Sequence, residues 1–258
     1  HFALDGVAMT QIIMLVFPLL MVLYTKKDIA MTFSLRFPGS LSGRNSLSHA
    51  ALPDGDQTEN SVSDRNDLKR RMKVISGSLL FGIGAILAGL VTSIIMAGLF
   101  TEENYQFSDA LFSMFDRPGI YVWFVVALMP AICEEMFFRG YVLAAFKSRY
   151  PVWLSIVFVG VFFGIYHTSL MRFPSTALLG MAFAYLTYKT GSIFPGMFFH
   201  CLNNSIALAS MYFPEWMESH LPFLADEMSV TTLITVCVIA VFLIVMGVLL
   251  MRKKTSYK

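Results

Sequence analysis

A small set of ionisable and amide side chains lies inside long apolar stretches of this sequence. They are Glu134, Glu135 and Arg139 in one stretch, His167 at the end of the next, and His200, Asn203 and Asn204 in a later one. A charged side chain at the centre of a membrane helix costs on the order of 2.5 to 3.5 kcal/mol on insertion scales. Such residues are usually retained for a function or for pairing with one another, so this set is the candidate site.

The acidic pair can be divided by helical geometry. Glu135 and Arg139 are four residues apart and share one face of a helix, with the acid preceding the base, which favours an ion pair. Pairing also reduces the cost of burying both charges. Glu134 lies about 100° around the helix from Glu135, so Arg139 does not neutralise it locally. Glu134 is therefore the acid predicted to do chemistry, and the alternative is that both acids only pair with Arg139.

Two histidines reach a similar depth from other stretches. Phe163 and His167 are four residues apart, and so are His200 and Asn204. Counted from the predicted cytoplasmic helix ends at about 1.5 Å per residue, Glu134 and His167 lie about 20 Å deep, Asn204 about 16 Å and His200 about 10 Å. A lone histidine in an apolar helix is more often a hydrogen-bonded core residue. Two histidines with a glutamate in one layer favour a site with its own hydrated cavity.

This combination of side chains is suited to hydrolysis without a covalent intermediate. A glutamate in apolar surroundings is a candidate general base that can activate water. His167 can share that water, and His200 with Asn204 can donate hydrogen bonds to the oxyanion forming on a peptide carbonyl.

Two chemical alternatives stay open at this point. Ser169, Ser205 and the three cysteines are nucleophiles on paper, but Cys133 and Cys201 are each adjacent in sequence to a site residue and so point to another side of their helices. Glu134, His167 and His200 are acceptable zinc ligands, and three ligands with water form the usual catalytic site. However, no His-Glu-x-x-His segment is present, and each candidate ligand stands alone on its helix.

The composition places these residues in a membrane protein. The 258 residues are 56% hydrophobic and only 14% charged, which indicates helices that are apolar on most faces. The net charge of +2 is too small to suggest nucleic-acid binding. The three cysteines lie in apolar runs without paired spacing and are interpreted as small buried side chains rather than disulfides.

Seven apolar stretches approach the length of about 20 residues that crosses a bilayer. They run from Val7 to Thr25, Val74 to Phe100, Ile120 to Phe146, Val152 to His167, Ser175 to Tyr188, Ile193 to Phe213 and Val230 to Met251. The predicted fold is an all-α, polytopic transmembrane helical bundle of about seven spans. Lys and Arg gather after the first, third, fifth and seventh stretches, whereas acidic residues dominate the other loops. Positive charge favours the cytoplasmic side, so we expect the N-terminus outside and the C-terminus inside.

The chain is expected to divide at a polar segment. Residues 1–37 form an N-terminal span that can be the tail of a preceding module, and residues 38–73 form a polar cytoplasmic linker. Residues 74–251 form the functional domain, and residues 252–258 a basic cytoplasmic tail. Because the first residue is His rather than Met, we expect the chain to be a processed or excised part of a longer protein.

Three motifs resemble those of the CAAX protease and bacteriocin-processing family, also called the CPBP or ABI family. Glu-Glu-Met-Phe-Phe-Arg at 134–139 resembles its Glu-Glu-x-x-x-Arg motif. Phe-Gly-Ile-Tyr-His at 163–167 is similar to its Phe-x-x-x-His element, and His-Cys-Leu-Asn-Asn at 200–204 to its His-x-x-x-Asn or Asp element. The motifs occur in the family order, each in an apolar stretch, over roughly residues 73–212.

The resemblance implies a metal-independent intramembrane endopeptidase that uses a glutamate and needs no cofactor. By motif position, Glu134 and His167 activate water, while His200 and Asn204 form the oxyanion site. The resemblance also favours this metal-free site over zinc.

The resemblance further implies supporting roles and partners. Glu135 and Arg139 form the supporting pair, with Phe163 beside the first histidine. The substrate is expected to be a membrane-embedded or lipidated protein or peptide, because eukaryotic relatives cut prenylated CAAX proteins and many bacterial relatives are linked to bacteriocin self-immunity. We expect an integral protein of the bacterial cytoplasmic membrane.

The first span and linker match none of the motifs. Some family members resemble fusions to a transporter permease, so a fused or associated transporter module is a candidate partner. The alternative function is non-enzymatic, as a permease segment, an ion-coupled carrier or an immunity scaffold.

Overall fold

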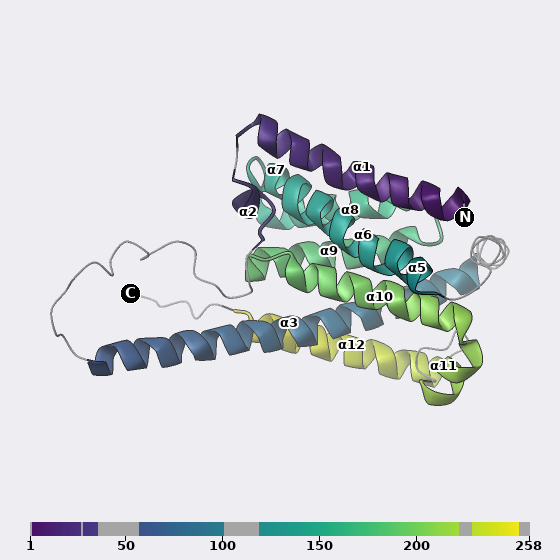
Figure 1. Cartoon of the computed structure of the whole chain (residues 1–258). Coiled ribbons are helices and arrows are strands. Elements are labelled where there is room, and N and C mark those ends of the chain that lie inside the picture. The colour runs from purple at the N-terminus through teal and green to yellow at the C-terminus, as the bar shows by residue number, and fades with distance from the viewer. Residues whose placement is uncertain (1, 27, 36–56, 101–118, 222–228, 253–258) are drawn as a thin grey trace.

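The computed structural model describes residues 2–26, 28–35, 57–100, 119–221 and 229–252. All regular secondary structure in these ranges is helical, so the predicted all-α fold is confirmed (Figure 1). The helices are α1 (Phe2–Tyr24), α2 (Ile29–Thr32), α3 (Gln57–Leu99), α5 (Ile120–Trp123), η1 (Phe124–Leu128), α6 (Met129–Glu134), η2 (Glu135–Val142), α7 (Leu143–Lys147), α8 (Val152–Tyr166), α9 (Phe173–Thr190), α10 (Phe194–Tyr212), α11 (Pro214–His220) and α12 (Val230–Leu250).

Every predicted apolar stretch is helical. The helices end close to the predicted positions, but α1 begins five residues before Val7 and α3 begins 17 residues before Val74. Among the described residues, four helical segments are long and apolar enough to cross a membrane, and α8 is a shorter apolar helix. The four are Asp5–Tyr24, Arg65–Leu99, Ile120–Lys147 and Val230–Leu250. An integral membrane protein is therefore confirmed, whereas the total of seven spans stays a prediction.

The predicted linker contains part of a long helix. From Gln57 onward the chain is helical and continues without a break into the second span as α3. The earlier part of the linker, the acidic loop after α3 and the end of the basic tail lie outside the described residues. The polar composition of 57–73 therefore marks a helix extension rather than irregular structure.

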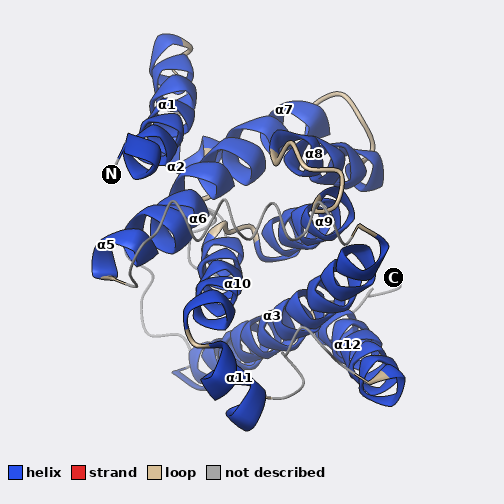
Figure 2. Cartoon of the chain, turned by 90° about the vertical axis from the view of Figure 1, so that its right-hand side faces the viewer, coloured by secondary structure: helices blue, strands red, loops and turns tan. Residues whose placement is uncertain are grey.

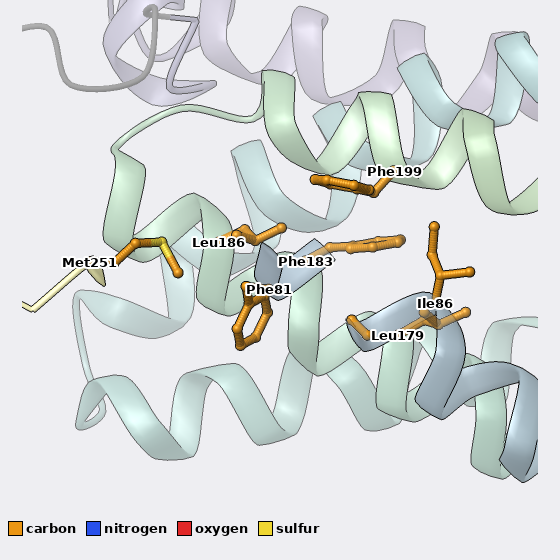
Figure 3. Packing of buried hydrophobic residues seen from close by; sticks show 8 residues of the cluster. Phe81, Ile86, Leu179, Phe183, Leu186, Phe199 and Met251 are labelled. Carbon is orange, nitrogen blue, oxygen red and sulfur yellow. The ribbon is translucent and has the colours of Figure 1, made fainter. Parts of the chain in front are cut away.

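The bundle is arranged around α9 and α10. Figures 1 and 2 show these two helices in the middle, with α1 on one side and the α3–α12 pair on the opposite side. A buried apolar cluster joins α3, α9, α10 and the end of α12 (Figure 3). Its buried members are Phe81, Ala85, Ile86, Leu179, Phe183, Leu186, Phe199 and Met251. This cluster fixes α9 and α10, which contribute to the site.

The long helix from Ile120 to Lys147 is not a uniform α-helix. Two segments within it, η1 and η2, have π-helical hydrogen bonding. Such segments are rare and are frequently found at functional sites. Glu134 is the last residue of α6 and Glu135 the first of η2, so the acidic pair lies on the junction.

Candidate active site

Glu135 and Arg139 form the predicted ion pair. Arg139 Nη1 lies 2.7 Å from Glu135 Oε1, and both side chains are fully buried. Arg139 Nη2 donates to the carbonyl oxygen of Gly180 at 3.2 Å. The guanidinium carbon also lies 4.3 Å from the ring centre of Phe163, a cation–π distance. These contacts tie η2 to α8 and α9 and compensate a buried charge pair that would otherwise be costly.

Two small residues let the chain approach this arginine closely. A Cβ atom at Gly180 would lie 2.9 Å from the Cα atom of Gly160, closer than side chains tolerate. Helices α8 and α9 therefore pack backbone to backbone at this crossing. The close approach helps to place the Gly180 carbonyl, an uncharged acceptor, next to Arg139.

His200 of α10 lies against both acids. Its Nδ1 is 3.0 Å from Glu135 Oε1, and its Nε2 is 3.8 Å from Glu134 Oε2. Since an ionised carboxylate only accepts, Nδ1 is the donor toward Glu135. The second separation exceeds hydrogen-bond length. The sequence suggested an oxyanion role for His200 and missed its contact with Glu135, because residues 65 positions apart have no local spacing rule.

Glu134 is held by a helix that the motifs did not include. Gln11 Nε2 of α1 donates to Glu134 Oε1 at 2.8 Å, and both side chains are 4% exposed. Among the described residues, Glu134 Oε2 has no hydrogen-bond partner. The only sequence signal for Gln11 was an amide in an otherwise apolar stretch. Glu134 therefore has one fixed oxygen and one oxygen facing His200.

A further basic group lies near the glutamate. Arg172 immediately precedes α9, where burial lowers the pKa of its guanidinium and the Glu134 carboxylate partly offsets that effect. Arg172 is one of the few basic residues in the loops that are predicted to lie outside the membrane.

His167 ends α8 with a defined ring orientation. Its Nδ1 lies 2.8 Å from the carbonyl oxygen of Phe163. A carbonyl only accepts, so Nδ1 carries the hydrogen and Nε2 of the neutral ring keeps a lone pair. Thr168 follows with φ of 50°, a left-handed conformation that is unusual for a β-branched residue. Residues in such conformations cluster at active sites.

Phe163 is shared by the two histidines. Its ring centre lies 4.7 Å from that of His167 and 5.7 Å from that of His200. The same ring faces Arg139. All three predicted motifs therefore meet around the ring of Phe163.

Asn204 lies one turn beyond His200 on α10. Its Nδ2 donates to the carbonyl oxygen of Val126 in η1 at 3.2 Å, and its Oδ1 accepts from Asn203 Nδ2 at 3.3 Å. An amide nitrogen has two hydrogens, so one donor remains after the Val126 contact. The π-helical segment η1 thus supplies the acceptor that orients this side chain.

No group of three or more His, Cys, Asp or Glu in the described part of the chain is placed to hold a metal ion. Metal independence remains a prediction.

An apolar cavity of about 190 Å³ lies between α5 and α10. It is lined by Gly119, Val122, Trp123, Ser205, Leu208, Ala209, Tyr212 and Phe213.

Comparisons with known proteins give one match. Residues 116–206 match the family model described as type II CAAX prenyl endopeptidase Rce1-like. This segment contains all three motifs, from Glu134 to Asn204. The comparison with curated proteins found no match, and neither did the comparison with solved structures. The family match confirms the resemblance seen in the motifs.

Proposed function

Since residues 116–206 match the Rce1-like family of type II CAAX prenyl endopeptidases, we propose that the chain hydrolyses peptide bonds within the membrane by a glutamate-activated water, without metal. The observation that carries this proposal is the environment of Glu134. The carboxylate is buried, one oxygen accepts from Gln11, and the other has no partner among the described residues and faces His200. A general base needs such a free oxygen.

The proposed reaction requires no covalent intermediate. Glu134 Oε2 takes a proton from a water molecule, and Nε2 of His167 accepts a hydrogen bond from the same water. The resulting hydroxide attacks the peptide carbonyl carbon. Asn204 donates to the developing oxyanion through its remaining N–H, and His200 donates when its Nε2 carries a proton. The C–N bond then breaks as Glu134 returns its proton to the leaving amine, which gives a carboxylic acid and a free amine.

The proposed substrate is a membrane-embedded or lipidated protein or peptide. The site residues lie on helices of a membrane bundle, which favours a substrate that is held in the same bilayer. We further propose that the protein lies in the bacterial cytoplasmic membrane, with its N-terminus outside and its C-terminus in the cytoplasm. Identification of the substrate would show whether the protein acts in bacteriocin immunity or together with a transporter module.

Replacing Asn204 with Ala is expected to lower kcat by about 10² to 10³, the usual cost of removing one oxyanion donor. The change leaves the water-activating residues in place, so KM should stay near the wild-type value. The measurement is cleavage of trapped substrates by protein reconstituted in lipid vesicles. Cys201→Ala on the same helix is the matched control and should retain full activity. An unchanged kcat in Asn204→Ala would remove this residue from the oxyanion site.

Chelators are expected to leave cleavage unchanged. In the proposed mechanism the carboxylate of Glu134 activates water directly, so no Lewis acid is required. The measurement is activity after dialysis against a strong chelator, together with elemental analysis of the purified protein. Loss of activity on chelation, restored by stoichiometric zinc, would instead support a zinc site at Glu134, His167 and His200.

A further inference from the structure

Gln11 is the polar member of an otherwise apolar contact stripe. Helix α1 buries Gln11, Met14, Pro18 and Val22 against the bundle, with spacings of three or four residues that define one helix face. The other described side chains of α1 are exposed or half-buried. A membrane helix with so narrow a contact face needs no amide for packing, and an apolar side chain would be less costly there.

The amide of Gln11 is directed at the predicted general base. Its Nε2 donates to Glu134 Oε1 at 2.8 Å, across 123 positions of sequence. Gln11 Oε1 has no hydrogen-bond partner within the described ranges. A glutamine side chain carries both a donor and an acceptor, so it can bond to Glu134 as a carboxylate and, after rotation, as a carboxylic acid. A proton-transferring base alternates between these two forms.

We propose that Gln11 is a positioning residue: it holds Glu134 Oε1 so that Oε2 faces the attacking water, which makes α1 part of the catalytic unit. This inference rests on the proposed function. It explains why a helix outside the three motifs packs against α6 and η2. Without this contact the carboxylate of Glu134 could rotate and lose its alignment with the water. Helix α1 is therefore proposed to be part of the catalytic unit and not an appendage.

The test compares Gln11→Met with Thr10→Val in purified, reconstituted protein. Met has nearly the shape of Gln but cannot donate a hydrogen bond. Thr10 is exposed in the same turn of α1, and among the described residues its hydroxyl donates to the carbonyl oxygen of Gly6 in its own helix, so its substitution is the matched control. We expect Gln11→Met to lower kcat by about 10- to 100-fold, the effect of losing a hydrogen bond to a charged group, with KM unchanged.

A spectroscopic measurement separates positioning from packing. Infrared difference spectra identify the carboxyl band of Glu134 as the one lost in Glu134→Gln. That band should move in Gln11→Met and stay in place in Thr10→Val, at unchanged thermal stability. Wild-type kcat in Gln11→Met would overturn the inference, and so would a lower kcat with an unmoved band and reduced stability. If Glu134→Gln itself still cleaves, the proposed function fails instead, so the two failures are distinguishable.

Discussion

Glu134→Gln is expected to abolish peptide cleavage while the protein remains folded. The amide keeps the shape of the side chain and can still accept from Gln11, but it cannot take a proton from water. General acid–base catalysis contributes about 10² to 10⁴ in rate, so activity should fall at least that far. Folding should be retained because a neutral amide is less costly to bury than a carboxylate.

The measurement for Glu134→Gln is cleavage in lipid vesicles together with thermal unfolding in detergent. The inactive variant also allows substrates to be trapped and identified from cell membranes. Glu218→Gln, at an exposed acid on α11, is the control and should behave as wild type. Persistent cleavage in Glu134→Gln would refute the mechanism. Full biological complementation by this variant would favour the non-enzymatic role as a carrier or immunity scaffold.

Glu135→Ala is expected to destabilise the fold, in contrast to the change at Glu134. It would leave Arg139 buried and without its carboxylate, and His200 would lose the acceptor of its Nδ1. Removing one partner of a buried ion pair costs about 3 to 5 kcal/mol. The measurement is the unfolding free energy in detergent, with expression level in the membrane as a second readout.

A double variant tests whether this loss comes from the stranded charge. Glu135→Leu with Arg139→Met replaces the pair by apolar side chains of similar volume, which is often neutral for stability. Stability should return, whereas activity should not, because His200 still lacks its partner. If Glu135→Ala is as stable as wild type and inactive, the two acids have the opposite roles.

The sequence by itself determined where most of the helices lie and which residues are candidates for the chemistry. Long apolar runs satisfy their backbone hydrogen bonds in lipid by forming helices, so the bounds of α8, α10 and α12 followed from hydropathy to within one residue at each end. The contact of Glu135 with Arg139 was also predictable, since four residues make one helical turn. Both inferences depend on local spacing. The position of Glu134 as the acid outside that pair follows from the same geometry.

Only the tertiary structure decided which side chains meet across helices. Gln11 reaches Glu134, and His200 reaches Glu135, over separations for which no periodicity exists. These contacts depend on how closely backbones pack, as at Gly160 and Gly180, and on π-helical turns that change the phase of the helix after Glu134. Packing is a property of all the side chains together, so a spacing rule along one helix cannot supply it.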